Sequence, residues 1–365
     1  MGILRLYLAF AVYAAHRGLL GFSLIPFSFT AVCCFFIVSG FYMNMVIAEK
    51  YGVTRDGLTK FYKNRVLRLY PVYVVVLLLW HLAWLWGASH RTPFTSIFGT
   101  LNQLALLPEV IWSHLILRPG PSFDANALFL GQTFTVGMEM VFYLVAPVLV
   151  LCRPRYLALV WFAGFIALHV PAWLGLAMRP WQYEFVPTVF VFFVTGCISY
   201  RLWLVVQDQV IVRWLALPLA LAIPAYCYLI DDLHVAQWVN RPAIYGLYVL
   251  VALAIPCFFA ATRKSRFDRA IGDLSYPLYV CQGFAVMLVM GPGEPATNAQ
   301  HAAALVLAFA ISAVLAFGVE RPIDAWRATL AKRTEKRNEP ALVDQEISAI
   351  NDRAARSRPG LASLG

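Results

Sequence analysis

Residues 3–22 read "ILRLYLAFAVYAAHRGLLGF", an apolar run interrupted by Arg5 near its start and by His16 and Arg17 near its end. A helix of about 20 residues rises about 30 Å, which is the thickness of the hydrocarbon core of a bilayer. Ionisable side chains are costly in such a segment unless they have partners, so each is a candidate functional residue. This stretch therefore predicts a membrane helix with positions at which chemistry is expected.

The composition extends the prediction to the whole chain. Of the 365 residues, 61% are hydrophobic and 13% charged, and the mean hydropathy is +0.69, outside the range of ordinary soluble domains. We therefore expect an all-α fold, a polytopic membrane helix bundle with about ten transmembrane helices. The expected spans are residues 3–22, 27–48, 71–87, 133–151, 156–176, 184–204, 214–230, 242–261, 271–290 and 302–319.

The Lys and Arg residues give the expected orientation. With a cytoplasmic N-terminus, ten spans place 24 of the 29 Lys and Arg residues on the inner side, in accord with the positive-inside rule. The other five are Arg17, Arg91, Arg118, Arg179 and Arg241. One helix more or fewer would scramble every later loop, so both termini are expected to be cytoplasmic. The bias favours a bacterial cytoplasmic (inner) membrane.

Three segments lie outside the expected spans. Residues 49–70, "EKYGVTRDGLTKFYKNRVLRLY", mix basic and apolar side chains as an interfacial helix does, and Pro71 is expected to open the next span. Residues 88–132 form the longest outer loop, of a length that is often functional. We expect residues 1–331 to form the membrane domain and residues 332–365 a polar, disordered cytoplasmic tail.

The cysteines, histidines and charged residues argue against disulfides, a metal site and a nucleic-acid partner. The seven cysteines include no CxxC pair and the histidines no HExxH motif, so we expect free thiols and no metal site. The net charge of +10 fits topology and attraction to anionic lipid, and it gives little support to a nucleic-acid partner. The lipid bilayer is the partner that the composition predicts.

Arg5 and His16 are eleven residues apart, close to three turns of about 3.6 residues, so they share one helix face. His16 lies about 20 Å beyond Ile3, in the outer half of the membrane, where we expect it to be buried. An imidazole suits proton transfer near neutral pH, which makes His16 a candidate base. A structural histidine bonded to a carbonyl near a helix end fits equally well, and the pattern leaves both interpretations open.

Glu139 is the second ionisable residue expected within a span. It lies about 9 Å from the start of span 133–151, at a depth comparable with that of His16. A carboxylate beside His16 would orient the ring and stabilise the imidazolium, as the third member of a catalytic triad does. A structural glutamate that accepts hydrogen bonds is the alternative of similar weight.

Arg65 and Arg68 in "KNRVLRLYP" (63–71) are three residues apart, on one face of a helix at the inner interface. Arginine forks bind phosphate in bidentate fashion, so a phosphorylated cytosolic cosubstrate is one expected ligand. Basic residues at an inner membrane surface more often serve topology and lipid headgroups. Ser39 and Gly40 in "CFFIVSGFY" (34–42) are interpreted as small residues that permit close helix packing.

Several motifs, in this order, resemble those of acyltransferase family 3, a family of integral-membrane O-acyltransferases. The first helix carries Arg5 and His16, "FFIVSGF" (35–41) is similar to FFxxSGF, and Arg65, Arg68 and Pro71 match RxxRxxP. "FTVGMEMVFY" (134–143) is similar to WSLxxExxFY, with Phe134 for Trp and Thr135 for Ser. "LSYPLYV" (274–280) is followed by Gln282 where histidine is frequent, and "VERP" (319–322) resembles the closing xExP.

The resemblance implies an acyltransferase that uses acyl-CoA, expected to be acetyl-CoA, as a cosubstrate. It implies His16 as the catalytic base, oriented by Glu139, and Arg5, Arg65 and Arg68 as contacts for the acyl-CoA donor. The implied acceptor is a hydroxyl of an extracytoplasmic glycan or glycolipid. Direct transfer and a covalent acyl-histidine step both remain open.

The competing function is a proton-coupled transporter or flippase of a polar or lipid-linked substrate. In it, Glu139 and His16 would form a proton relay. The chain shows no inverted repeat of the kind many transporters have, which weighs weakly against this alternative.

Overall fold

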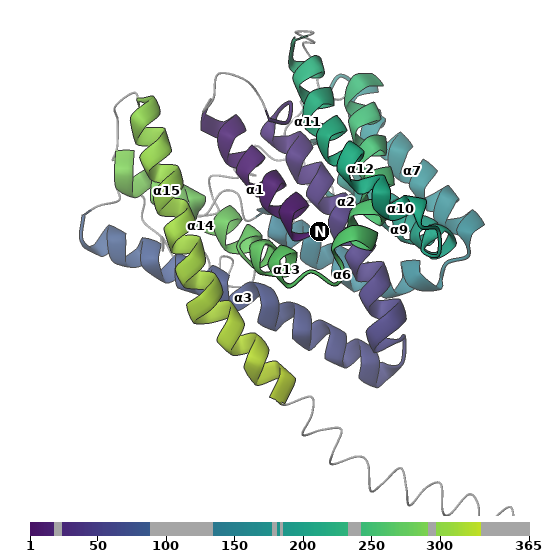
Figure 1. Cartoon of the computed structure of the whole chain (residues 1–365), viewed down its shortest axis with the longest axis horizontal. Coiled ribbons are helices and arrows are strands. Elements are labelled where there is room, and N and C mark those ends of the chain that lie inside the picture. Colours follow the sequence, from purple (N-terminus) through teal and green to yellow (C-terminus); the bar gives the residue numbers. More distant parts are fainter. Residues whose placement is uncertain are drawn as a thin grey trace, which may run out of the picture. The chain divides into compact units, whose positions relative to one another are not determined.

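The computed structural model describes residues 1–17, 24–87, 134–176, 181–182, 185–232, 242–290 and 297–329, and within them the elements are helices (Figure 1). The outer loop expected at 88–132 and the tail expected at 332–365 lie outside the described residues. The helices are α1 (Gly2–Arg17), α2 (Ser28–Val46), η1 (Ile47–Tyr51), α3 (Arg55–Leu85), α6 (Phe134–Leu151), α7 (Pro154–Trp173), α9 (Val186–Val206), α10 (Ile211–Trp214), α11 (Ala216–Asp232), α12 (Pro242–Thr262), α13 (Arg266–Asp273), α14 (Ser275–Met290), α15 (Asn298–Leu315) and η3 (Ala316–Glu320).

The expected polytopic helical bundle is confirmed. Among the described residues, nine helices are long and apolar enough to cross a membrane, and residues 2–16 of α1 form a shorter apolar helix. Each of the ten overlaps one of the ten expected spans, although the third begins at Arg55 and not near residue 71, and the last continues to Thr329, past the expected end at residue 319. Residues 1–316 form one compact unit that contains every candidate site residue.

The expected helix break at Pro71 is wrong, because α3 is one continuous helix of 31 residues. It begins at Thr54, whose side chain accepts a hydrogen bond from the backbone N–H of Gly57 and so caps the first turn. Pro71 lacks the N–H that would bond the preceding turn, a loss that neighbouring helices offset in membrane proteins. The Tyr276 hydroxyl donates to the Leu69 carbonyl at 2.8 Å and ties α14 to this part of α3.

The helix α2 packs between α1 and α9, and two glycines make its contact with α9 possible (Figure 1). A Cβ atom added to Gly40 would collide with the Phe193 carbonyl, and one added to Gly196 would collide with the Ile37 carbonyl. The two backbones therefore approach as closely as glycine allows. This confirms the packing role expected for Gly40.

The first turn of α1 is held by Asp268 on α13. The Asp268 carboxylate accepts hydrogen bonds from the backbone N–H groups of Gly2 (2.7 Å) and Ile3 (3.0 Å). It also pairs with the α-ammonium group of Met1 at 2.5 Å. A negative charge at a helix N-terminus satisfies the free N–H groups and opposes the positive end of the helix dipole. Asp268 thereby fixes the position of the helix that carries Arg5 and His16.

We expect Gly40→Ala and Gly196→Ala each to destabilise the protein by about 1–3 kcal/mol, because the added methyl group forces α2 and α9 apart. The melting temperature in detergent measures the effect. Gly318→Ala is the control, since a Cβ atom there meets no described atom within 4 Å. Melting temperatures equal to that of the wild type in both variants would contradict the close approach of α2 and α9.

Candidate active site

A stripe of polar side chains runs along α6. Thr135, Glu139 and Tyr143 are spaced by four residues, which places them on one face of the helix. The Thr135 and Tyr279 hydroxyl groups form a hydrogen bond of 2.7 Å that joins α6 to α14. Glu139 receives a hydrogen bond of 2.5 Å from Ser39 on α2. The stripe, about 12 Å long at 1.5 Å per residue, thus contacts several neighbouring helices.

Glu139 is the centre of the stripe. Its Oε1 atom accepts the hydrogen bond from Ser39 and a second one, of 2.6 Å, from the hydroxyl group of Tyr143. In residues 134–143 every side chain is buried except that of Glu139, which is partly exposed. Glu139 is thus a carboxylate fixed by two donors that remains partly accessible.

Arg65 lies at the Tyr143 end of the stripe and is 9% exposed. Its guanidinium carbon is 5.9 Å from the centroid of the Tyr143 ring and 5.6 Å from that of Phe61, a cation–π arrangement with both rings. One terminal nitrogen donates to the sulfur of Met43 at 3.7 Å. The Nε atom has no partner among the described residues. Glu139 acts on Arg65 only through the longer-range field of its charge.

Three more arginines, from three helices, lie within electrostatic range of Tyr42 on α2. Arg5, Arg68 and Arg269 each act electrostatically on the Tyr42 hydroxyl. A Cβ atom at Gly272 of α13 would lie 3.8 Å from the guanidinium of Arg5, so α1 and α13 are in contact here. Arg68 also acts electrostatically on Arg65, at the Tyr143 end of the stripe. Arg5, Arg65 and Arg68, the three residues expected to bind the donor, are thus linked through the field of Arg68 at Tyr42 and Arg65 and that of Arg5 at Tyr42.

His16 lies near the far end of α1, beyond the stripe. Tyr13, three residues earlier, packs against Val286 on α14, seven residues past Tyr279, the partner of Thr135. His16 is therefore at least about 10 Å further from the arginines than Thr135 is. Its side chain is exposed, which corrects the expected burial.

The depth expected for Glu139 also needs correction. The prediction from the sequence took the start of span 133–151 as the membrane surface, and it therefore placed Glu139 at the depth of His16. The bond between Thr135 and Tyr279 instead places the first described turn of α6 beside Tyr279, seven residues before Val286 on α14, and Glu139 lies about 6 Å further towards Arg65. Ser39 and Tyr143 are the hydrogen-bonding partners that the structure gives Glu139. Its pairing with His16 stays a prediction.

Sequence reasoning missed four residues of this site: Ser39, Tyr42, Tyr143 and Arg269. Ser39 was assigned to packing, and its contact with Glu139, a hundred residues away in the sequence, follows only from how α2 packs on α6. Tyr143 lies four residues after Glu139, a spacing that predicts contact on a helix. Arg269 was counted only towards the orientation of the chain. Its proximity to Tyr42 depends on how α13 packs, which no local pattern gives.

These features define a polytopic helical membrane protein with a group of arginines at one end of its polar stripe. The family model of the acyltransferase domain matches residues 3–318, nearly the whole chain. The chain therefore belongs to acyltransferase family 3, and it is an acyltransferase. No curated protein and no solved structure matches it.

The hydrogen bond between Tyr143 and Glu139 is expected to couple the two residues energetically. Glu139→Gln and Tyr143→Phe should each cost about 1–3 kcal/mol of stability, and the double variant should cost less than the sum. Melting curves in detergent measure the coupling. As the control, Tyr276→Phe, which removes the bond to Leu69, should be additive with Glu139→Gln. Additive losses for Glu139 and Tyr143 would show that the bond contributes nothing.

Proposed function

We propose that the protein moves an acyl group, expected to be acetyl, from cytosolic acyl-CoA to a hydroxyl group of an extracytoplasmic glycan or glycolipid. Membership of acyltransferase family 3 supports O-acyl transfer in a membrane. Acyl-CoA is proposed as the donor because the positive charge of Arg65 has no negatively charged partner in direct contact. The order of the groups along the bundle supports the direction of transfer.

Arg65 is a buried cation without a carboxylate in direct contact. Two aromatic faces and a thioether sulfur surround it, and its Nε atom has no described partner. Removing an arginine from water without full compensation is costly, and a bound anion would supply the missing partner. Guanidinium groups favour phosphate because their donors match its oxygens. We assign this position to a phosphate of acyl-CoA, with Arg5, Arg68 and Arg269 holding the others.

The stripe on α6 supports a route for the thioester. From Tyr143 to Thr135 it offers hydroxyl and carboxylate groups along about 12 Å of an otherwise apolar bundle. Gln282 on α14, one turn past Tyr279, is 6% exposed, and its side-chain oxygen has no partner among the described residues. The pantetheine arm of CoA is thin and carries amide N–H groups. In the proposed complex one of these donates to Gln282.

His16 is the proposed base. It takes the proton of the acceptor hydroxyl, whose oxygen attacks the thioester carbonyl and forms the new ester. The carbon–sulfur bond breaks, and the CoA thiolate leaves with the proton that His16 had accepted. The exposed position of His16 at the far end of α1 suits an acceptor that arrives from outside. A route through acyl-histidine uses the same residue as the nucleophile.

Glu139 is proposed as a positioning residue on the donor side. Its charge lies between the hydroxyl groups of Ser39 and Tyr143 and acts on Arg65. It would keep Tyr143 and the guanidinium oriented towards the incoming phosphate and pantetheine. The family resemblance implies that Glu139 orients His16. In the proposed complex Glu139 would do so indirectly, by positioning the donor, when donor and acceptor are both bound.

Arg65→Gln is expected to weaken CoA binding about 10-fold to 100-fold, because a hydrogen bond to a charged group contributes about 1.5–3 kcal/mol. Calorimetric titration of the purified protein in nanodiscs measures the affinity without requiring the acceptor. Lys63→Gln, which removes an exposed charge two residues earlier in α3, is the control and should bind CoA normally. Unchanged CoA affinity in Arg65→Gln would rule out the assigned phosphate position.

His16→Ala is expected to abolish the transfer while leaving CoA binding unchanged. Mass spectrometry of envelope glycans from cells that express the wild type should detect an acyl increment that disappears in this variant. His81→Ala is the matched control, since His81 lies near the corresponding end of α3 and stacks on Trp84 at 5.6 Å. If the acyl increment persists in His16→Ala at equal protein levels, His16 is not the base.

A further inference from the structure

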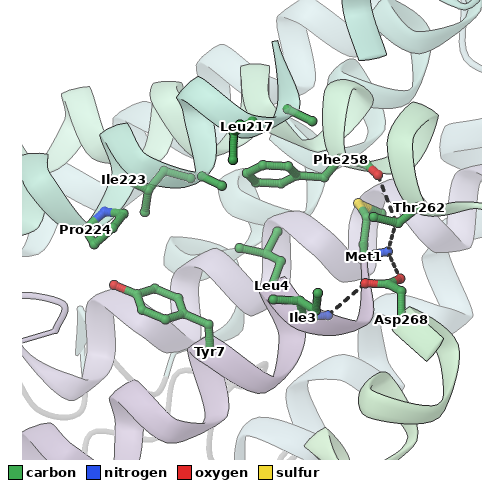
Figure 2. Close-up of a pocket in the computed structure, with 12 residues that line it drawn as sticks. Met1, Ile3, Leu4, Tyr7, Leu217, Ile223, Pro224, Phe258, Thr262 and Asp268 are labelled. Carbon is green, nitrogen blue, oxygen red and sulfur yellow. Dashed lines mark hydrogen bonds and ion pairs between the residues drawn. The ribbon is translucent and has the colours of Figure 1, made fainter. Parts of the chain in front are cut away.

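An apolar groove lies between α1, α11 and α12, on a different face of α1 from Arg5 (Figure 2). Its volume is about 330 Å³. Figure 2 shows Tyr7 and Pro224 at one end and Met1, Thr262 and Asp268 at the other, with Leu4 between them. The charged groups of the groove thus lie at the end where α1 begins, and the rest of the lining is apolar except for the hydroxyl of Tyr7, which donates to the Leu24 carbonyl at 2.7 Å.

The groove opens to the surroundings of the bundle. Ile3 and Leu217 both line it, and their side chains are 54% and 70% exposed. Leu221, one turn further along α11, does not line the groove and is 65% exposed. The helices α11 and α12 are candidate membrane spans, so the opening faces lipid hydrocarbon. From Leu217 to Pro224 the groove follows α11 for about 10 Å along the bilayer normal.

Three basic residues follow the polar end of the groove in the sequence. The turn from α12 to α13 carries Arg263, Lys264 and Arg266 between two groove-lining residues, Thr262 and Asp268. All three basic side chains are exposed. Arg263 stacks on the Trp203 ring at 5.3 Å. No ion pair with a described residue neutralises Lys264 or Arg266.

The charge of Asp268 does not cancel this basic turn. Its carboxylate already accepts hydrogen bonds from the backbone of Gly2 and Ile3 and pairs with the ammonium group of Met1. The uncompensated charge at the mouth of the groove is therefore positive. A ligand that fits both parts has a hydrocarbon chain and an anionic headgroup.

We propose that the groove binds one acyl chain of an anionic phospholipid whose phosphate contacts Lys264 and Arg266. The positive-inside bias makes this the inner leaflet, where anionic lipid attracts basic side chains. One lipid can occupy both the groove and the basic turn, because the residues of that turn directly follow Thr262, which lines the polar end of the groove. The lipid would fill the space between α1 and α11 and hold the helix that carries Arg5 and His16.

Native mass spectrometry of the protein released from nanodiscs tests the site. With the wild type we expect a one-to-one adduct with phosphatidylglycerol that is at least tenfold stronger than that with phosphatidylcholine. Ala220→Trp places a large ring in the groove and should remove the adduct. Leu221→Trp adds the same ring to the next position of α11, outside the groove, and should keep it.

The headgroup contact is tested separately. Lys264→Glu with Arg266→Glu should abolish the preference for phosphatidylglycerol, whereas Lys63→Glu on α3 should preserve it. Melting curves check that each variant folds, and Ala220→Leu replaces Ala220→Trp if the larger ring prevents folding. Equal binding of the two lipids by the wild type, or an adduct that survives a folded groove-filling variant, overturns the proposal. The lipid adduct and the CoA affinity are measured separately, so failure of this proposal is distinguishable from failure of the proposed donor.

Discussion

A charged group among membrane helices has to be balanced by the protein or by a ligand, because the surrounding hydrocarbon offers no partner. Asp268 meets this constraint completely, since the first turn of α1 supplies its hydrogen bonds and a positive partner. Arg65 meets it only in part, through aromatic faces and a sulfur atom. The first charge therefore fixes a helix, and the second retains the capacity to bind an anion.

The same constraint orders the groups along the bundle. The arginines lie at one end, the polar stripe of α6 begins beside Arg65, and His16 lies beyond its other end. In the proposed reaction the large anionic nucleotide stays with the arginines and only the acyl group reaches the far side. Because only the acyl group and the pantetheine arm enter the bundle, a narrow polar route is enough and no wide opening is needed. Close contacts such as that of Gly40 with α9 leave little other space.

Much of the fold could be predicted from the sequence, because lipid imposes a length and an apolar composition on every span. The burial and the contacts of single residues were harder to predict, because they depend on the depth of each helix and on the helices that pack against it. Pro71 did not end α3, because a membrane helix tolerates one missing hydrogen bond where its surroundings can offset the loss. Ser39 became a partner of Glu139, and Arg269 approached Tyr42, only through packing between helices distant in sequence.

The most direct test of the central claim is a cryo-electron microscopy map of the protein in nanodiscs with bound CoA. Because the charge of Arg65 is only partly balanced within the protein, we expect phosphate density within hydrogen-bonding distance of its guanidinium. The pantetheine arm should extend along α6 towards His16. CoA density whose phosphates lie away from Arg65, with this side chain unchanged and still without an anionic partner, would contradict the claim.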